Sequence, residues 1–430
     1  MIFGGLRRRE GQSRDILGRN GKQSDKDVSK AIAGPPAYCA VRTVVVEISN
    51  WATLLFLVCL SAPALVAVPH YTLTARRSPD FRLLTPVRIN GAGPFSCEFD
   101  TGGTSLSVDT AVAAKAGLKA NGQGQSAGEG PLVTADQRIL DATVEIGPLS
   151  ASNRTVVLRP LDEECVLGTG VFLSFVVQLD YSKPEIRLYD AADFRPAPNM
   201  VSVPVTYVNG GPVIPVRLGL KPGITIDAKF LVDTGVPLFP IGIRKDFTDA
   251  NDLTHKLEKV VTPPFGGQSS GAFNLLASRI ASLSVGPFTT QDDVAILFRA
   301  TTPVALAWDG NIGSEFFRRF TLTLDYPSKR LFLEPNGELR QPPAPFDCSG
   351  LGIGGSPGKF QVRTVLPNSP AEAAGLKVGD LVLSIDDKPS AQLDIDQIRA
   401  KLYRTTGEVA IRVLRGDSDV SVTVELKPAL

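Results

Sequence analysis

The chain has 430 residues, which is enough for two or three domains that each bury a hydrophobic core. Its formal net charge is +1, so the charge balance gives no reason to expect nucleic acid as a partner. Two histidines in the whole chain and no zinc-like cysteine spacing argue against a Ser-His or Cys-His enzyme, and we expect no metal ion and no other cofactor.

The N-terminal part consists of a polar lead followed by an apolar run. Residues 1–50 are polar and are predicted to be disordered. Residues 51–68 are uncharged and apolar, with a core of the length of a signal-peptide h-region, and Ala62-Pro63-Ala64 offers a small-x-small cleavage site. We interpret residues 51–67 as a signal peptide or an anchor, with membrane anchoring through residues 51–68 as the alternative to cleavage. In both cases we expect export, to the periplasm or to the inner membrane of a bacterium.

The central part of the chain contains one pattern twice. Each copy has the same five landmarks in the same order. The step from the glycine of the fourth landmark to the aspartate of the fifth is 12 positions in both, from Gly168 to Asp180 and from Gly313 to Asp325. A repeated pattern reports a repeated structural unit, so we infer a duplication. The landmarks are Pro86-Val87-Arg88, Asp100-Thr101-Gly102, Gly147-Pro148, Val166-Leu167-Gly168 and Asp180-Tyr181, then Pro215-Val216-Arg217, Asp233-Thr234-Gly235, Gly286-Pro287, Asn311-Ile312-Gly313 and Asp325-Tyr326.

Both copies are predicted to be mainly β-structure. Their apolar stretches are short, rich in Val, Ile, Leu and Phe, and bounded by Gly, Pro and Asn. Residues 321–333 predict a hairpin, and residues 178–189 repeat it. Helical signals are few: one covers Asp109–Ala116 and another covers Arg244–Asp249.

Asp100 and Asp233 occupy matching positions in the two copies, which suggests a pair of carboxyl groups on a pseudo-twofold axis. Two carboxylates in contact share one proton, because like charges at that distance cannot both ionise. The ionised one can take a proton from water, while the protonated one polarises a scissile carbonyl. Glycine after Asp-Thr lets the two loops turn tightly and approach, and the threonine hydroxyls can cross-link them. The supporting residues are Thr101, Gly102, Thr234 and Gly235.

The pattern resembles aspartic proteases of the retropepsin-like and pepsin-like kind over about residues 80–335. The resemblance implies an endopeptidase acting on peptides or proteins, with a bilobal β-barrel fold whose lobes span residues 68–199 and 200–340. The second copy departs from the family pattern in Val236-Pro237-Leu238 and in Asn311. In that family a glycine-rich hairpin covers the cleft, and two segments here are either such flaps or ordinary loops. Their candidate residues are Gly124, Gly128, Gly266 and Gly267.

Two other interpretations of the repeat stay open. A protease fold without activity would serve as a peptide-binding scaffold. The stretch Asp100-Thr101-Gly102-Gly103-Thr104-Ser105 also resembles a phosphate loop of the actin-like kinases and chaperone ATPases. That fold needs long helices, which this sequence does not predict.

The cysteines leave a further choice open. Cys39 and Cys59 would leave with the signal segment, so Cys97, Cys165 and Cys348 remain. Cys97 lies three residues before Asp100 and Cys165 lies three residues before Gly168, which predicts neighbouring core strands. They either form a disulfide or, as we favour, remain two small buried thiols.

The C-terminal part begins with a proline linker over residues 341–348 and continues as a separate unit over residues 349–430, with a predicted helix at Ile395–Tyr403. Gly350-Leu351-Gly352-Ile353-Gly354 and the later Ser369-Pro370-Ala371-Glu372 resemble a PDZ domain of bacterial exported proteases. The resemblance implies a small β-sandwich with helices that adds a peptide strand to its sheet edge and binds the C-terminal carboxylate of the peptide. The alternative is a domain that packs on the lobes and binds nothing. The predicted carboxylate-binding residues are Leu351, Gly352, Ile353 and Gly354.

Overall fold

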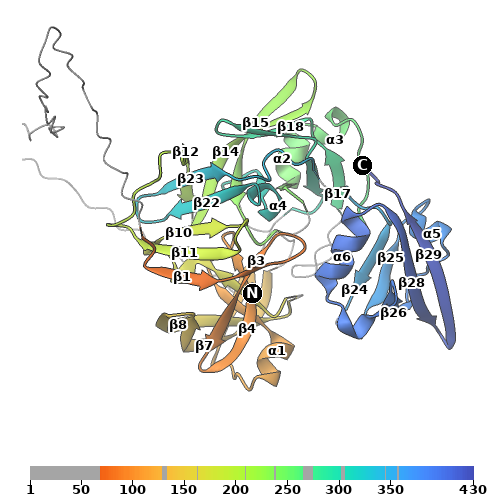
Figure 1. Cartoon of the computed structure of the whole chain (residues 1–430), viewed down its shortest axis with the longest axis horizontal. Coiled ribbons are helices and arrows are strands. Elements are labelled where there is room, and N and C mark those ends of the chain that lie inside the picture. The colour runs from red at the N-terminus through yellow and green to blue at the C-terminus, as the bar shows by residue number, and fades with distance from the viewer. Residues whose placement is uncertain are drawn as a thin grey trace, which may run out of the picture. The chain divides into compact units, whose positions relative to one another are not determined.

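Strands dominate the structure of this protein, a computed structural model shown in Figure 1. The structure describes residues 68–127, 133–161, 163–208, 210–236, 239–264, 275–301, 306–343, 345–355 and 358–430. Strands of these residues form four sheets, and the longest helix among them, α6 (Ile395–Arg404), has 10 residues. The predicted mainly-β fold is confirmed. The long helices of the actin-like alternative are not found in the described part of the chain.

The first lobe is built on an eight-stranded sheet in the order β2-β3-β4-β9-β5-β8-β7-β6. Strand β4 ends at Asp100 and lies parallel to β9, with Asp100 opposite Gly168. Phe99, just before the aspartate, is fully buried in the main hydrophobic core. The strands are β2 (Arg76–Arg77), β3 (Leu83–Ile89), β4 (Ala92–Asp100), β5 (Leu106–Asp109), β6 (Gly122–Ala127), β7 (Val133–Ile146), β8 (Leu149–Arg159) and β9 (Cys165–Gly168).

The second lobe repeats this arrangement in a nine-stranded sheet, ordered β17-β20-β16-β21-β15-β14-β18-β19 with β13 pairing to β14. Its parallel pair β15–β21 and antiparallel pair β16–β21 match β4–β9 and β5–β9 of the first lobe. The duplication seen in the sequence is therefore a duplication of topology. The strands are β13 (Thr206–Val208), β14 (Gly211–Lys221), β15 (Ile224–Val232), β16 (Ile241–Ile243), β17 (Leu275–Arg279), β18 (Ser282–Val285), β19 (Phe288–Gln291), β20 (Val294–Phe298) and β21 (Gly310–Ile312).

A third sheet joins the two copies through their terminal hairpins. Strands β10 and β22 pair antiparallel with Gln178 opposite Thr323, and the Gln178 side-chain amide donates a hydrogen bond of 3.1 Å to the Thr323 hydroxyl. Both hairpins expected from the sequence are present. The sheet consists of β1 (Tyr71–Thr74), β11 (Glu185–Asp190), β10 (Phe175–Asp180), β22 (Phe320–Asp325), β23 (Arg330–Pro335) and β12 (Val201–Val203).

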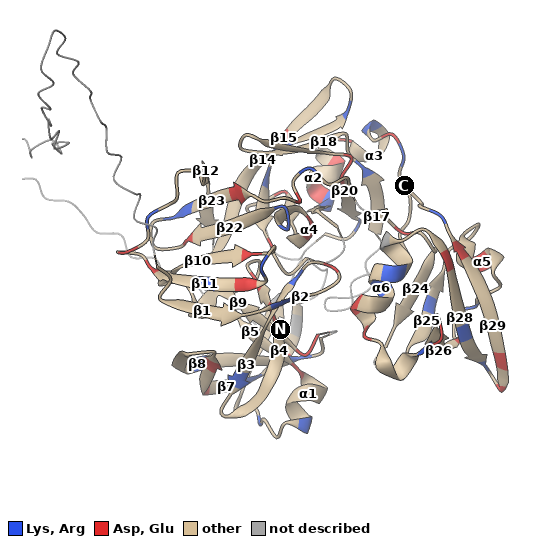
Figure 2. Ribbon diagram, in the orientation of Figure 1, with Lys and Arg blue, Asp and Glu red and all other residues tan. Residues whose placement is uncertain are grey.

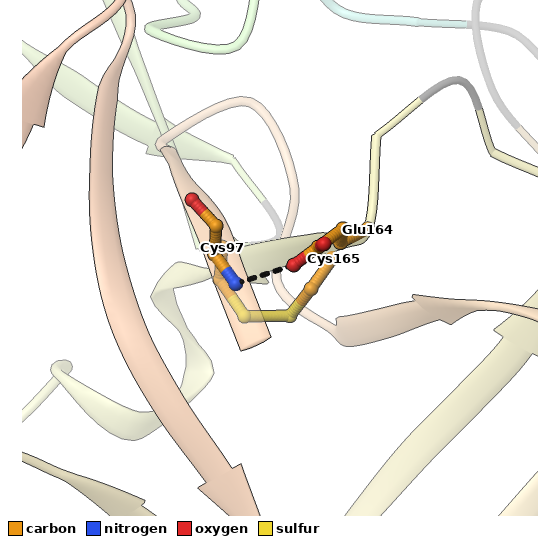
Figure 3. The surroundings of a disulfide bond; sticks show 4 residues. Cys97, Glu164 and Cys165 are labelled. Atoms are coloured by element: carbon orange, nitrogen blue, oxygen red, sulfur yellow. Dashed lines mark hydrogen bonds between the residues drawn. A yellow bond between two sulfur atoms is a disulfide. The ribbon is translucent and has the colours of Figure 1, made fainter. Parts of the chain in front are cut away.

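Cys97 and Cys165 form a disulfide between β4 and β9 (Figure 3). Our preference for two free thiols was wrong. The parallel register places the two residues directly opposite each other, with their Cα atoms 4.3 Å apart. Next to the bond, the Ser96 N–H donates to the Glu164 carboxylate at 2.9 Å. Cys348 is a buried free cysteine.

Short helices follow the strands that lead away from the two motifs. The Asp109 carboxylate caps α1 (Thr110–Lys115) by accepting hydrogen bonds from Ala111 and Val112 N–H, which explains why the helix begins there. At the matching place in the second lobe lies α2 (Lys245–Ala250), one residue later than expected. The other helices of the two lobes are α3 (Leu253–Lys256), α4 (Ser314–Phe317) and the 3-10 turn η1 (Thr169–Val171).

The C-terminal unit has a sheet of its own in the order β24-β25-β26-β28-β29, with β27 pairing to β26. Helix α6 begins with a capping box between Asp394 and Gln397. Acidic and basic residues are interspersed along the elements drawn in Figure 2. Among the residues that the structure describes, no helix is long and apolar enough to cross a membrane. The unit consists of β24 (Leu351–Gly354), β25 (Gln361–Val365), α5 (Pro370–Ala373), β26 (Leu381–Ile385), β27 (Lys388–Pro389), η2 (Ser390–Gln392), α6, β28 (Gly407–Arg415) and β29 (Ser418–Leu426).

Candidate active site

The two Asp-Thr-Gly loops lie face to face, so that each aspartate covers the glycine of the other loop. A Cβ atom added to Gly102 would lie 2.4 Å from Cγ of Asp233, and one added to Gly235 would lie 2.7 Å from Cγ of Asp100. Any side chain at either glycine would therefore displace a carboxyl group. This close approach is the physical reason for glycine at both places.

Two threonines cross-link the loops reciprocally. The Thr101 hydroxyl donates to the Val232 carbonyl at 2.7 Å, and the Thr234 hydroxyl donates to the Phe99 carbonyl at 2.7 Å. Each threonine N–H donates to the hydroxyl oxygen of the other threonine at 3.1 Å. Both residues are buried, so these four bonds lie out of reach of water.

Each carboxyl group is also held from within its own loop. The Gly102 N–H donates to Oδ1 of Asp100 at 2.7 Å, and the Gly235 N–H donates to Oδ1 of Asp233 at 3.3 Å. In the second lobe Asn311 adds a bond from its Nδ2 to Oδ2 of Asp233, at 3.2 Å. Sequence reasoning flagged Asn311 as a departure from the family pattern but assigned it no role. Two oriented carboxyl groups at the loop crossing can share a proton and bind a water molecule.

A buried charge cluster lies under the first lobe's motif, and sequence reasoning missed it. Arg82 forms ion pairs with Asp80, Glu98, Glu163 and Asp396. Burial raises the pKa of Glu98, and the neighbouring Arg82 guanidinium opposes that rise. The sequence indicates this charge cluster only by an arginine two residues after an aspartate, a pattern that also occurs in many surface turns.

Buried tyrosines from the two Asp-Tyr landmarks lie near the loops. The Tyr181 hydroxyl lies 3.4 Å from the Ser314 hydroxyl. The Ser314 hydroxyl in turn donates a hydrogen bond of 2.6 Å to the Thr234 carbonyl. Burial raises the pKa of Tyr181 above its ordinary value, and it also raises the pKa of Tyr326 well above its ordinary value. Both phenols therefore remain protonated in the pH range in which a carboxyl pair shares a proton.

The first glycine-rich segment forms a strand pair. Gly124 lies on β6 opposite Asp136 of β7, and the Arg138 side chain crosses it to donate to Asp136 at 2.7 Å. This hydrogen bond lowers the pKa of Asp136 and keeps it ionised. The other flap candidates, Gly128, Gly266 and Gly267, lie outside the described residues.

In the described ranges, no group of three or more His, Cys, Asp or Glu residues could hold a metal ion.

The predicted carboxylate-binding residues of the C-terminal unit form the edge strand β24, and Leu351–Gly354 are all buried. Helix α6 packs against this strand, and its Tyr403 hydroxyl donates to the Leu351 carbonyl at 3.0 Å. Just before the strand, Asp347 accepts the Gly350 N–H at 2.8 Å. Burial raises the pKa of Asp347 to about 6.

Two parts of the chain match known families. Residues 85–171 match the family described as aspartyl protease, and residues 361–426 match the PDZ domain family. The aspartic proteinase from Irpex lacteus is similar in structure over 64% of this chain and 99% of its own, with 14% sequence identity and a TM-score of 0.41. No curated protein matches the chain. The predicted combination of an aspartyl protease domain with a C-terminal PDZ domain is confirmed by the two family matches.

Proposed function

We propose that the chain is an exported aspartic endopeptidase in which Asp100 and Asp233 share one proton. The observation that carries this proposal is the reciprocal threonine cross-link, which fixes both carboxyl groups against the opposite loop. The aspartyl protease match of residues 85–171 supports the same reaction, because that range includes the first motif. Peptides and proteins are the substrates of such a site.

The reaction follows from the chemistry of the pair. The ionised carboxyl takes a proton from a water molecule while the water oxygen attacks the scissile carbonyl carbon. The protonated carboxyl gives its proton to the carbonyl oxygen, so a neutral gem-diol forms. When the gem-diol collapses, the C–N bond breaks, the nitrogen receives a proton and a new carboxyl group remains. The pair then holds one shared proton again.

Substitution of each aspartate tests the proposal. Asp100→Asn and Asp233→Asn each remove the exchangeable proton and should abolish cleavage of a peptide library, with a loss of about 10³-fold or more. The double variant should be no worse than either single variant, because residues that act as a unit are non-additive. Asp227→Asn, at an exposed aspartate of the second lobe, is the control and should retain activity.

Retention of activity in either dyad variant would contradict the dyad. Absence of cleavage by the parent protein itself, with peptides still bound, would support the inactive scaffold instead. Pepstatin-like inhibitors should block turnover by the parent protein.

Export is the second part of the proposal. The apolar run at residues 51–68 supports it, as does the disulfide between Cys97 and Cys165, because disulfides persist in oxidising compartments. Cell fractionation of the full chain should place it in the periplasm or at the inner membrane. A chain that lacks residues 51–67 should stay in the cytoplasm, and an unchanged distribution would rule out this role of the segment.

We also propose that the PDZ domain docks the C-termini of substrates, and that the β6–β7 hairpin covers bound peptide. The family match over residues 361–426 supports a PDZ domain, and the edge position of β24 supports strand addition at Leu351–Gly354. Docking would raise the local concentration of a protein substrate at the protease site.

A further inference from the structure

The two halves of the dyad have different surroundings. Asn311 on β21 lies opposite Leu231 of β15, two residues before Asp233. Alternate residues of a strand point to the same side of a sheet, so Leu231, Asn311 and Asp233 share one side. In the first lobe, Val166 on β9 takes the place of Asn311. Asp233 therefore has an amide neighbour at a position where Asp100 has an apolar one.

The Asn311 side chain is fixed in one orientation. It is 2% exposed, and its Nδ2 donates to Oδ2 of Asp233 at 3.2 Å. Its Oδ1 points the other way, towards Gly242 on β16, where an added Cβ atom would lie only 2.3 Å away. The glycine leaves room for the far side of the amide group, and the nitrogen faces Asp233 because only the N–H₂ end of the amide can donate to a carboxylate oxygen.

An amide N–H₂ can only donate a hydrogen bond, whereas a hydroxyl can donate or accept. A donor directed at Oδ2 stabilises Asp233 more when the carboxyl group is ionised than when it is neutral, because a hydrogen bond to a charged acceptor is stronger. The interaction therefore distinguishes the two protonation states of Asp233.

The two aspartates also differ in the strand residue two positions before them. The residue two before Asp100 on β4 is Glu98, which is buried beside Arg82, whereas the matching residue in the second lobe is Leu231. Ionised Asp100 and ionised Glu98 repel each other, and this repulsion contributes to the raised pKa of Glu98.

We propose that Asn311 is a positioning residue that keeps Asp233 as the ionised, water-activating member of the dyad and leaves the shared proton on Asp100. Asp100 then donates its proton to the scissile carbonyl oxygen. The proposal assigns two different roles to two aspartates that the sequence pattern makes equivalent. It rests on the proposed endopeptidase function.

The test measures the titration of one aspartate at a time. In the Asp100→Asn background, the ¹³C resonance of the Asp233 carboxyl is followed from pH 2 to 8 with and without Asn311→Val, which installs the residue of the first copy. Loss of a charge-stabilising donor should raise the titration midpoint of Asp233 by about one pH unit. The same Asn311→Val change in the Asp233→Asn background is the matched control, and it should not change the titration midpoint of the Asp100 carboxyl.

Activity gives a second readout in the protein with both aspartates. Asn311→Val should move the acid limb of the kcat/KM profile to higher pH by about one unit and lower kcat/KM by roughly tenfold at pH values below it. Asn311→Thr can still donate a hydrogen bond, so its acid limb should shift less than that of Asn311→Val. The threonine variant also replaces the valine variant if the valine variant does not fold.

An unchanged Asp233 titration in Asn311→Val would overturn the proposal even if the enzyme cleaves peptides. Conversely, full cleavage by Asp100→Asn and Asp233→Asn would overturn the proposed function, whatever the carboxyl titrations show. The two failures are therefore distinguishable.

Discussion

Asp347 already occupies part of the loop to which the PDZ resemblance assigns a ligand carboxylate. It accepts the Gly350 N–H, and the Leu351 N–H donates to the Ser349 hydroxyl at 3.0 Å. Asp347 and Gly350 also line a pocket of ≈ 830 Å³, which Lys427 borders. A peptide carboxylate that binds this loop would have to compete with Asp347 while it is ionised.

Binding of C-terminal peptides should therefore depend on pH. Burial raises the pKa of Asp347 to about 6, so below that pH the residue is neutral and no longer repels an incoming carboxylate. We expect a peptide with a free apolar C-terminus to bind several-fold more tightly at pH 5 than at pH 7.5. Its C-terminal amide should bind weakly at both values. Fluorescence anisotropy with labelled peptides would measure both.

Asp347→Asn is the matched control for this prediction, because it keeps the side-chain shape without the charge. In that variant the acid peptide should bind almost equally at the two pH values. Equal binding of acid and amide peptides by the parent protein would show that the loop does not recognise a carboxylate.

At the residue scale, the repeat was sufficient to predict which aspartates, threonines and glycines meet. The spacing within each motif is local, and the matching positions in the two copies predict which loops face each other. The hydrogen bond from Asn311 to Asp233 was not predictable, because it depends on the register of β21 against β15. Arg82 was missed because its partners lie far apart in sequence, up to Asp396.

At the element scale, the disulfide fastens the strand that ends at Asp100 to its parallel neighbour. Cys97 on β4 and Cys165 on β9 are 68 residues apart in sequence, so the bond closes a long loop in the unfolded chain. Loss of such a cross-link destabilises a protein by about 4 kcal/mol in the chain-entropy model.

Reduction or the double variant Cys97→Ala/Cys165→Ala should lower the Tm by roughly 10 °C. Differential scanning calorimetry with and without a reductant would measure the change. Cys348→Ala is the control, since that cysteine is free, and it should show the same drop on reduction as the parent protein. A Tm that does not change after complete reduction would mean that the bond adds no stability.

Elements defined by local pattern were predictable, and pairings between distant strands were not. The hairpins at residues 178–189 and 321–333 follow from alternation and a turn, and α1 follows from the Asp109 cap. The parallel ladders β4–β9 and β15–β21 join residues far apart, and local propensity contains no register. This is why the choice between thiols and a disulfide could not be settled from spacing.

At the scale of the whole molecule, the PDZ domain shares buried surface with the second lobe. One apolar cluster includes Leu275, Ala277 and Ile296 of that lobe together with Phe360 and Val382 of the PDZ domain. The order of the domains was predicted from motifs and from the proline-rich stretch. This shared cluster was not, because each of its residues also fits the core of its own sheet.

Buried carboxyl groups should make the protein most stable in mild acid. Burial raises the pKa of Asp347 and Asp396 to about 6, and it raises the pKa of Asp293 and Glu98 as well. A carboxyl group with a raised pKa in the folded state stabilises the fold below its ordinary pKa and loses that contribution as the pH rises. For Asp347 the rise of about two units corresponds to on the order of 3 kcal/mol.

Other carboxyl groups set the lower limit of this range. Ion-pair hydrogen bonds hold the pKa of Asp136 and Asp380 below the ordinary value, so these groups stabilise the fold above that value and lose their contribution in strong acid.

We therefore expect the free energy of unfolding to be highest between about pH 4 and 6 and to fall towards pH 8. Urea unfolding at half-unit steps from pH 3 to 8 would measure it, and Asp347→Asn should flatten the decline between pH 5 and 7.5. A free energy of unfolding that is highest above pH 7 would show that the buried carboxyl groups do not govern the pH dependence of stability. A free energy of unfolding that is highest in mild acid would match the pH range in which an aspartate pair holds one shared proton.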